Sequence, residues 1–411
     1  MEKLVGNAIV GQSGGPTAAI NATLAGVIRG VREGRCPGIR KLYGMRNGME
    51  GFLAERLIDL DRAVDSEEKL GLLEHTPAAA LGSCRKKLPD PEREPAVYED
   101  LLRLFRKYDI RYFFYIGGND SMDTVSRLSA FLAGRDWQMV ILGVPKTIDN
   151  DLLGTDHTPG FGSAAKYIAV TVQEILRDCA VYTVPAVTVV EIMGRDAGWL
   201  TASAAAGACV SGIGPDLIYL PERDFSTAQF LSDLRAALKK HPNVVVAVSE
   251  GIRFADGRYV GEGAQSGASD AFGHAYLAGA GKVLEQLVRQ EIGCKVRSVE
   301  LNLPQRCAAH LASETDLSES VGVGRAAVIA AAQGVTGEMM TIGRTGNSPY
   351  TVAYGHAAVG EIANRVRRVG DRYINEEGNG MTDAFGEYIL PLIQGEVSPV
   401  YENGIPKHLI L

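Results

Sequence analysis

A lysine and two aspartates stand together in the segment VPKTIDND, residues 144–151, of this 411-residue chain. Asp149 and Asp151 alternate, so in an extended segment their carboxylates face the same side. One carboxylate can then act as a general base while the other organises a metal ion or the lysine. Lys146 supplies a compact positive charge that suits a phosphate group. A salt-bridged turn is the alternative, but an apolar run at residues 139–144 predicts a buried strand that would end in this cluster.

A second polar cluster, GGNDS at residues 117–121, also follows an apolar run. Asp120 is a candidate ligand for Mg²⁺, which prefers hard oxygen donors, and the amide oxygen of Asn119 is another. Helix capping by Asp120 or Ser121 is the simpler interpretation, but it explains only part of the cluster. We therefore predict a magnesium site at this position.

A glycine turn, GQSGGPT at residues 11–17, precedes a helical pattern. Free backbone N–H groups in such a turn can hold an anion, although a tight strand–helix turn is the simpler interpretation of the segment alone. It lacks the G-x-x-x-x-G-K-[ST] pattern, so it does not predict a P-loop ATPase site.

Arg195, in MGRDAGW at residues 193–199, could grip a phosphate or carboxylate with its planar guanidinium group. Alternatively, it forms an ion pair with Asp196 or Glu191. The sequence leaves both interpretations open.

Glu250, in SEG, could bind a sugar hydroxyl or cap the next turn. Arg297 and Arg306 flank a predicted strand and are candidates for a second phosphate, although surface arginines are common. Several cations, a carboxylate for Mg²⁺ and a candidate base are together the equipment of phosphoryl transfer, where positioning and charge neutralisation supply most of the catalysis.

These candidates follow apolar runs that predict buried β-strands. The pattern of strand, polar turn and helix recurs in four segments, residues 7–31, 111–132, 186–199 and 243–251. It predicts an α/β fold with mainly parallel sheets, in which ligands bind beyond the carboxyl ends of the strands. The charged segment 86–95 is expected on the surface, and the glycine-rich segment 257–273 is expected to be a mobile loop.

The composition excludes several classes of protein. A net charge of −7 argues against nucleic-acid binding, which needs concentrated Lys and Arg. We find no apolar run of the ~20 residues that a transmembrane helix requires, so no membrane partner is expected. The six cysteines form no C-x-x-C pair, which favours reduced thiols and a cytoplasmic location.

In type and order, these motifs resemble those of the phosphofructokinase family. The resemblance rests on SGG (13–15), LGSCR (81–85), GGNDS, PKTIDND, TDHTPGFGSA (155–164), EIMGRDAGWLT (191–201), SEG (249–251) and LNLPQR (301–306). It implies a glycolytic phosphotransferase that needs Mg²⁺, with two Rossmann-like lobes and an active site in the cleft between them. Residues 1–160 plus 305–390 would form the donor lobe, and residues 161–304 plus 391–411 the sugar-phosphate lobe.

Two positions divide this family by phosphoryl donor. ATP-dependent members usually carry GGDGS and PGTIDND, whereas pyrophosphate-dependent members usually carry GGDDS and PKTIDND. Asp120 and Lys146 stand where the ATP type has glycine. The resemblance therefore implies transfer from inorganic pyrophosphate to the 1-hydroxyl of fructose 6-phosphate, expected to be reversible. The alternatives are an ATP-dependent 6-phosphofructokinase and a catalytically silent regulatory subunit.

Residue roles carry over by position within these motifs. Asp149 would be the base, with Lys146 and Asp120 as its catalytic partners, and Asn119 and Asp120 would hold the metal. The pyrophosphate site would comprise Gly15, Arg85 and Lys146. The substrate-binding residues would be Thr147, Ile148, Asp149, Met193, Gly194, Arg195, Glu250, Arg297 and Arg306. Arg297 would come from a neighbouring subunit, which implies a homodimer or homotetramer.

The chain departs from the family pattern at a few positions. Asn119 replaces an aspartate near the expected metal, which removes one charge there. Leu303 stands where many members have His or Tyr, and Ala186 where ATP-dependent members often have a substrate-binding Arg. The departure at Leu303 leaves open a longer acceptor such as sedoheptulose 7-phosphate.

Overall fold

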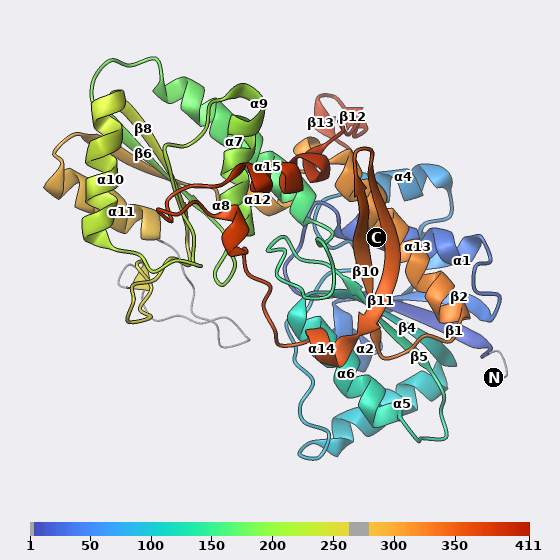
Figure 1. The fold of residues 1–411 in the computed structure, drawn as a ribbon. Coiled ribbons are helices and arrows are strands. Elements are labelled where there is room, and N and C mark those ends of the chain that lie inside the picture. The colour runs from blue at the N-terminus through green and yellow to red at the C-terminus, as the bar shows by residue number, and fades with distance from the viewer. Residues whose placement is uncertain (1–3, 263–278) are drawn as a thin grey trace.

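The computed structural model describes residues 4–262 and 279–411. Two separate β-sheets form the centres of two lobes (Figure 1). The part of the predicted glycine-rich loop at residues 263–273 lies outside the described residues. No described helix is long and apolar enough to cross a membrane.

The larger sheet has seven strands in the order β11-β10-β5-β4-β1-β2-β3. Its strands are β1 (Gly6–Gln12), β2 (Ile39–Met45), β3 (Leu57–Asp59), β4 (Ile110–Gly117), β5 (Val140–Pro145), β10 (Glu338–Asn347) and β11 (Tyr350–Ala358). The pairs between β2 and β10 are parallel, while β3 and β11 add antiparallel edges. The predicted parallel sheet is therefore confirmed, but the β10–β11 hairpin was not predicted.

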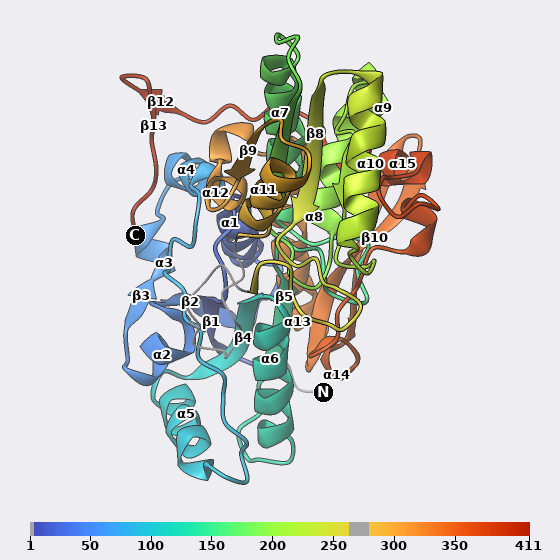
Figure 2. The same ribbon diagram turned by 90° about the vertical axis from the view of Figure 1, so that its left-hand side faces the viewer.

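The helices of the larger lobe cover both faces of this sheet (Figures 1 and 2). They are α1 (Ile20–Arg32), α2 (Gly48–Leu53), α3 (Leu60–Ala63), α4 (Glu67–His75), α5 (Pro95–Lys107), α6 (Asn119–Leu132), α13 (Glu314–Ala332) and α14 (Val359–Ile362). Strands β4 and β5 are buried along nearly their whole length, as continuous apolar strands in a covered sheet should be. Helices α1 and α13 can pack closely because Gly26 has no side chain. A Cβ at this position would lie only 2.1 Å from the carbonyl oxygen of Val321.

The smaller sheet has four parallel strands in the order β7-β8-β6-β9. They are β6 (Ala186–Ile192), β7 (Leu217–Tyr219), β8 (Asn243–Ser249) and β9 (Lys295–Glu300). The helices around them are α7 (Phe161–Cys179), α8 (Trp199–Ala202), α9 (Ala206–Ser211), α10 (Thr227–Lys240), α11 (Ala280–Glu291) and α12 (Pro304–Cys307).

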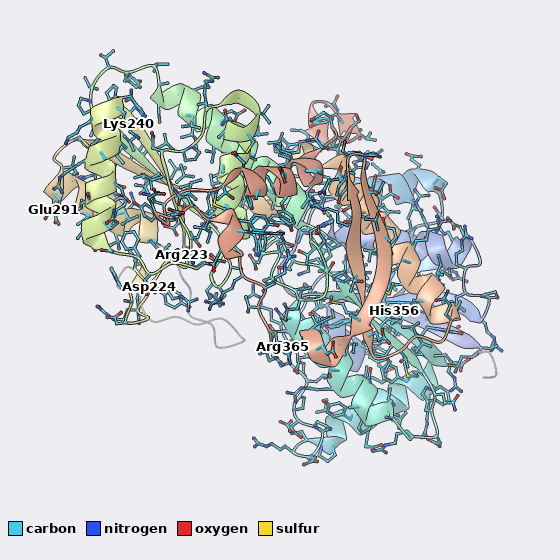
Figure 3. All side chains as sticks on the ribbon, viewed as in Figure 1. Arg223, Asp224, Lys240, Glu291, His356 and Arg365 are labelled. Carbon is cyan, nitrogen blue, oxygen red and sulfur yellow. The ribbon has the colours of Figure 1, made fainter. Side chains whose placement is uncertain are left out.

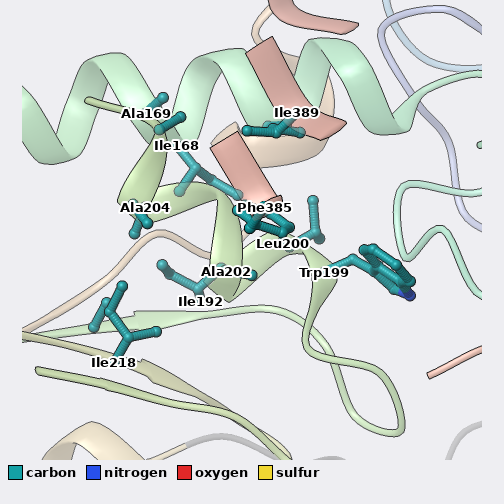
Figure 4. Close-up of a cluster of buried hydrophobic side chains, with 14 of the residues drawn as sticks. Ile168, Ala169, Ile192, Trp199, Leu200, Ala202, Ala204, Ile218, Phe385 and Ile389 are labelled. Atoms are coloured by element: carbon teal, nitrogen blue, oxygen red, sulfur yellow. The ribbon is translucent and has the colours of Figure 1, made fainter. Parts of the chain in front are cut away.

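The C-terminal segment contributes to the core of the smaller lobe. Helix α15 (Asp383–Ile389) places Phe385 and Ile389 against Ile168 of α7 and Leu200 of α8 (Figure 4). Val369 and Leu392 belong to the same buried cluster. We therefore propose that residues 369–392 belong to the smaller lobe rather than to the donor lobe. The lobe boundaries before residue 369 stay a prediction.

The chain between β5 and α7 is held by buried polar contacts with α13. The carboxylate of Asp316 accepts hydrogen bonds from the backbone N–H groups of Gly160 and Ser163, both at 2.9 Å. His157, which is 2% exposed, lies between Asp156 and Glu319 and bonds to both. Burial alone would lower the pKa of His157, but hydrogen bonds with these two carboxylates outweigh it and raise the pKa to about 9.

The last segment of the chain returns to the larger lobe. A short hairpin, β12 (Tyr401–Glu402) and β13 (Ile405–Pro406), precedes the terminus. The N–H of Leu409 donates to the hydroxyl of Thr76 at 2.9 Å, and Leu409 and Leu411 pack against the core around α1. The chain therefore crosses between the lobes more than once after α12.

Candidate active site

A cleft of about 440 Å³ lies at the carboxyl ends of the strands of both lobes. The loops after β1, β4, β5, β6 and β8 all contribute to it, in the position expected for ligand sites of α/β folds. The predicted residues that line it are Gly15, Arg85, Asn119, Asp120, Lys146, Thr147, Ile148, Asp149, Met193, Arg195, Glu250 and Arg306. The structure thus brings together side chains that are up to about 290 positions apart in the sequence.

Lys146 is buried at the end of β5, with only 3% of its surface exposed. Its ammonium group donates a hydrogen bond of 2.7 Å to the carbonyl oxygen of Gly15, in the glycine turn after β1. Burial lowers the pKa of Lys146 to about 8, although the negative charges of Asp149 and Asp151 stabilise its ammonium form and oppose the shift. The lysine therefore places a weakly solvated positive charge next to the glycine turn.

Asp149 and Asp151 both line the cleft, but not for the reason inferred from the sequence. Asn150 between them has a left-handed backbone, with φ of 54°, so the segment is not extended. The buried side chain of Asn150 stabilises this bend: it donates to the Tyr388 hydroxyl at 2.8 Å and accepts from the N–H of Thr158 at 3.1 Å. The prediction of an extended segment is therefore wrong. A bend held by the Asn150 side chain directs the two carboxylates into the cleft instead.

The two carboxylates have different surroundings. Burial raises the pKa of Asp149, while the charges of Lys146 and Arg195 oppose the shift. Burial and the nearby Asp149 raise the pKa of Asp151 to about 7, and the amide of Asn119 donates to it at 3.3 Å. The charges of Lys146 and Arg195 therefore favour the ionised form of Asp149, whereas the charge of Asp149 disfavours the ionised form of Asp151.

Asn119 and Asp120 begin helix α6 without capping it. The residue at the N-cap position is Gly118, and no side chain caps the helix, so the capping interpretation is wrong. Asp120 forms an ion pair with Lys87 at 2.8 Å. The amide oxygen of Asn119 is buried and has no hydrogen-bond partner within the described part of the chain, an arrangement that a bound cation would satisfy.

The oxygen donors at this position fit Mg²⁺. Within residues 4–262 and 279–411, no group of three or more His, Cys, Asp or Glu side chains is arranged to hold a metal ion. Mg²⁺ is commonly held by one or two carboxylates plus substrate phosphates and waters. The unpartnered oxygen of Asn119 and the carboxylate of Asp120 are such a set.

The smaller lobe contributes Met193, Arg195 and Glu250 to the cleft. The carboxylate of Glu250 accepts a hydrogen bond from the N–H of Gly194 at 3.2 Å, and burial raises the pKa of Glu250 to about 7. Gly194 therefore supports the site through its backbone. The amide oxygen of Gln305, which was not predicted, accepts from the N–H of Met193 at 3.2 Å.

Arg195 does not form the ion pairs that the sequence left open. Asp196 pairs with Arg253 at 2.5 Å, and Glu191 accepts hydrogen bonds from the N–H groups of Gly279 and Gly281. The Nε atom of Arg195 is buried without a partner among the described residues. Its guanidinium group is thus available to an anionic ligand.

Arg85 and Arg306 bring two more cations to the glycine turn. A Cβ at Gly15 would lie 3.5 Å from the guanidinium group of Arg306. Burial and the charge of Arg85 lower the pKa of Arg306. Together with Lys146, these arginines form a strongly cationic pocket that suits a multiply charged anion.

Arg297 is not brought to the cleft. It is exposed on β9, an edge strand of the smaller sheet, opposite Thr188. Its assignment to the site of a neighbouring subunit stays a prediction.

Several cleft residues were missed in the sequence. Lys87 lies in the charged segment expected on the surface, yet it lines the cleft. Asn364 and Val366 line it from the segment after α14, where no motif singled them out. Lys87 could have been suspected from its closeness to Arg85, but Asn364 and Val366 carried no such signal.

The fold and the site define an α/β protein with a cleft between two lobes that is lined by several cationic side chains. Residues 7–329 match the model of the family described as Phosphofructokinase, so the chain belongs to the phosphofructokinase family. This confirms the resemblance inferred from the motifs.

Two relatives that are similar to almost the whole chain carry the same name. The pyrophosphate–fructose 6-phosphate 1-phosphotransferase of Halomonas elongata is 42% identical over 405 residues, covering 98% of this chain and 95% of the relative. The protein of the same name from Xanthomonas campestris pv. campestris is 42% identical over 413 residues, covering 99% and 96%. The crystal structure of a pyrophosphate-dependent phosphofructokinase from Nitrosospira multiformis superimposes with a TM-score of 0.88 at 37% identity, covering 99% of this chain and 96% of that one.

Proposed function

We propose that this protein transfers a phosphoryl group from inorganic pyrophosphate to the 1-hydroxyl of fructose 6-phosphate, giving fructose 1,6-bisphosphate and phosphate. The observation that carries the proposal is the buried ammonium group of Lys146 against Gly15, in the cleft that Arg85 also lines. The names of the relatives support the same donor and acceptor. The reaction is a reversible step of glycolysis, since pyrophosphate in the forward direction and fructose 1,6-bisphosphate in the reverse direction have similar phosphoryl-transfer potentials.

The choice of donor follows from two side chains. Asp120 occupies space that the sugar and α-phosphate of a nucleotide would need, and its charge would repel that phosphate. Lys146 fills the space that a nucleotide would otherwise occupy, and its charge neutralises part of the charge of pyrophosphate. ATP is therefore excluded by size and charge, while the smaller pyrophosphate fits.

Asp149 is the base in this mechanism. It accepts the proton of the sugar 1-hydroxyl as that oxygen attacks the terminal phosphorus of pyrophosphate, and the bond to the bridging oxygen breaks. The N–H of Asp149 donates to the hydroxyl of Thr147 at 3.1 Å, which orients the loop toward the transferring group. Lys146 and Arg85 stabilise the charge that develops on the leaving phosphate.

Asn119 and Asp120 would hold Mg²⁺, with Asp151 hydrogen-bonded to Asn119 at 3.3 Å. The ion would neutralise charge on the pyrophosphate oxygens when bound. Asp120 would exchange its ion pair with Lys87 for the metal.

The sugar phosphate binds to the smaller lobe. Arg195 and Arg306 hold its phosphate, and Glu250 accepts hydrogen bonds from the sugar hydroxyls, beside the backbone of Met193 and Gly194. Arg297 of a second subunit adds to the phosphate site, so the active form is a homodimer or homotetramer. A cytoplasmic location belongs to the same proposal.

The first experiment is a coupled assay of the purified protein with fructose 6-phosphate and Mg²⁺, run in parallel with pyrophosphate and with ATP. Turnover with pyrophosphate alone supports the proposal. Turnover with ATP alone would mean that Lys146 and Asp120 do not decide the donor. No turnover with either donor would favour a regulatory subunit or a different acceptor, and sedoheptulose 7-phosphate would be assayed next.

A further inference from the structure

The segment between α14 and the short helix η4 (Asp371–Tyr373) crosses from the larger lobe to the smaller one (Figure 1). It lies beyond residue 329, where the match to the family model ends. Two of its residues, Asn364 and Val366, line the cleft. Between this wall and the core of the smaller lobe stands Arg367.

The guanidinium group of Arg367 donates hydrogen bonds to the loop that carries Asp149 and Asp151. Its Nε donates to the carbonyl oxygen of Asn150 at 3.2 Å, and Nη1 donates to the carbonyl oxygens of Thr155, at 3.0 Å, and Asp156. Its backbone N–H donates to the carbonyl oxygen of Asp151 at 2.8 Å. One residue thus binds the loop at four carbonyl oxygens between Asn150 and Asp156.

The same residue is fixed to the smaller lobe. The indole N–H of Trp199 donates to the carbonyl oxygen of Arg367 at 2.9 Å, and the guanidinium group lies 4.6 Å from the centre of the Trp199 ring. Nη2 donates to the Tyr388 hydroxyl at 3.2 Å. The Tyr388 hydroxyl also accepts a hydrogen bond from the amide of Asn150 at 2.8 Å. The bend between the two aspartates is therefore also held by the smaller lobe.

These contacts connect the two halves of the site. Trp199 ends the segment that carries Arg195, while Asn150 lies next to Asp149. Building on the function proposed above, we propose that Arg367 is a positioning residue that sets the base Asp149 against the sugar phosphate held by Arg195. Arg367 itself is not among the residues that line the cleft.

Only arginine can make this set of contacts. Its fork presents five N–H donors in fixed directions and stays charged at all working pH values, whereas lysine offers one ammonium group on a flexible stem. A misplacement of about 1 Å far from the chemistry can cost about 10²-fold in rate. Loss of the fork should therefore reduce kcat much more than it weakens substrate binding.

The test compares Arg367→Met and Arg367→Lys with the wild type in steady-state assays. We expect kcat of Arg367→Met to fall about 100-fold, with KM for pyrophosphate and for fructose 6-phosphate changed by no more than about threefold. Arg367→Lys should recover part of the loss because it keeps one donor and the charge. The matched control is Arg365→Met, because Arg365 is exposed in the same segment, near α14 (Figure 3), and is not among the cleft residues.

Hydrogen exchange measured by mass spectrometry gives a readout that needs no turnover. Arg367→Met should speed exchange in the peptides covering residues 147–158 and 193–201, and Arg365→Met should not. If kcat of a folded Arg367→Met variant stays within about twofold of the wild type, the positioning role is overturned. If that variant does not fold, the same kcat criterion is applied to Arg367→Lys.

The hydrogen-exchange measurement also distinguishes failure of this inference from failure of the proposed function. A wild-type protein that turns over with neither donor contradicts the proposed function. Unchanged exchange at residues 147–158 in Arg367→Met contradicts the positioning role of Arg367, whichever donor the enzyme uses.

Discussion

The ammonium group of Lys146 and the carbonyl oxygen of Gly15 are joined by a hydrogen bond of 2.7 Å, although 131 positions separate the two residues. This bond ties the end of β5 to the turn after β1. It places the lysine charge where a phosphoryl donor would meet the backbone N–H groups of the glycine turn. We therefore expect this contact to contribute both to donor binding and, together with Asp120, to donor choice.

Replacing Lys146 and Asp120 together by glycine should change the donor. The double variant removes the charge that holds pyrophosphate and opens the space beside α6, so pyrophosphate activity should fall by about 10²-fold or more while ATP activity begins to appear. Parallel assays with both donors measure the switch. A double variant that still used only pyrophosphate would contradict the steric explanation of donor choice.

Replacing the proposed base should reduce chemistry rather than binding. Asp149→Ser should lower kcat by about 10²–10⁴-fold, the usual contribution of a positioned base, with a much smaller change in KM. The surface residue Asp136, whose side chain is 81% exposed, offers the control Asp136→Ser. Near-normal kcat in Asp149→Ser would assign the base to another residue.

The pH dependence of donor capture should follow Lys146. Burial lowers the pKa of this lysine to about 8, so the charge that attracts pyrophosphate is present below that pH and lost above it. We expect kcat/KM for pyrophosphate, which reports the free enzyme, to fall as pH rises through about 8. Lys146→Met retains only the ionisations of the substrates and the other residues, so its profile should lack this step. Identical profile shapes for the two proteins would exclude the lysine as its source.

Stability should depend on the buried His157. Its pKa in the folded protein is raised to about 9, above the ordinary value of 6.5, so its contribution is complete below about pH 6.5 and is lost as pH rises through 9. His157→Gln leaves Asp156 and Glu319 without their shared cation and should lower the free energy of unfolding at pH 6 by about 3 kcal/mol. Urea denaturation at pH 6 and at pH 9.5 should show a smaller difference at the higher pH. A difference that grew with pH would mean that the histidine is neutral in the folded protein.

Subunit mixing can test the predicted role of Arg297. A mixture of Arg297→Ala and Asp149→Ser subunits, unfolded and refolded together, would contain hybrids in which one site has both an intact base and an intact arginine from its neighbour. Activity well above that of either variant refolded alone is the expected result. Activity no higher than the average of the two variants would place Arg297 outside the site of its partner.

Much of the chemistry could be predicted from local sequence. The apolar runs before Lys146 and Asn119 correctly predicted β5 and β4, because the period and type of side chains within a few residues determine local structure. The position of these polar clusters at strand ends then predicted that they would meet, since the carboxyl ends of parallel strands share one edge of a sheet. The sequence by itself therefore determined the type of fold and the kinds of groups in the cleft.

Only the tertiary structure decided how those groups are aimed. The sequence suggested an extended segment at Asp149, whereas the bend at Asn150 depends on Tyr388, more than 200 positions away. Lys87 likewise pairs with Asp120, more than 30 positions away, and Arg367 contacts Asn150 only because the chain crosses between the lobes there. Such contacts cannot be read from local patterns, because a side chain's type and period do not specify which distant segment will be packed against it.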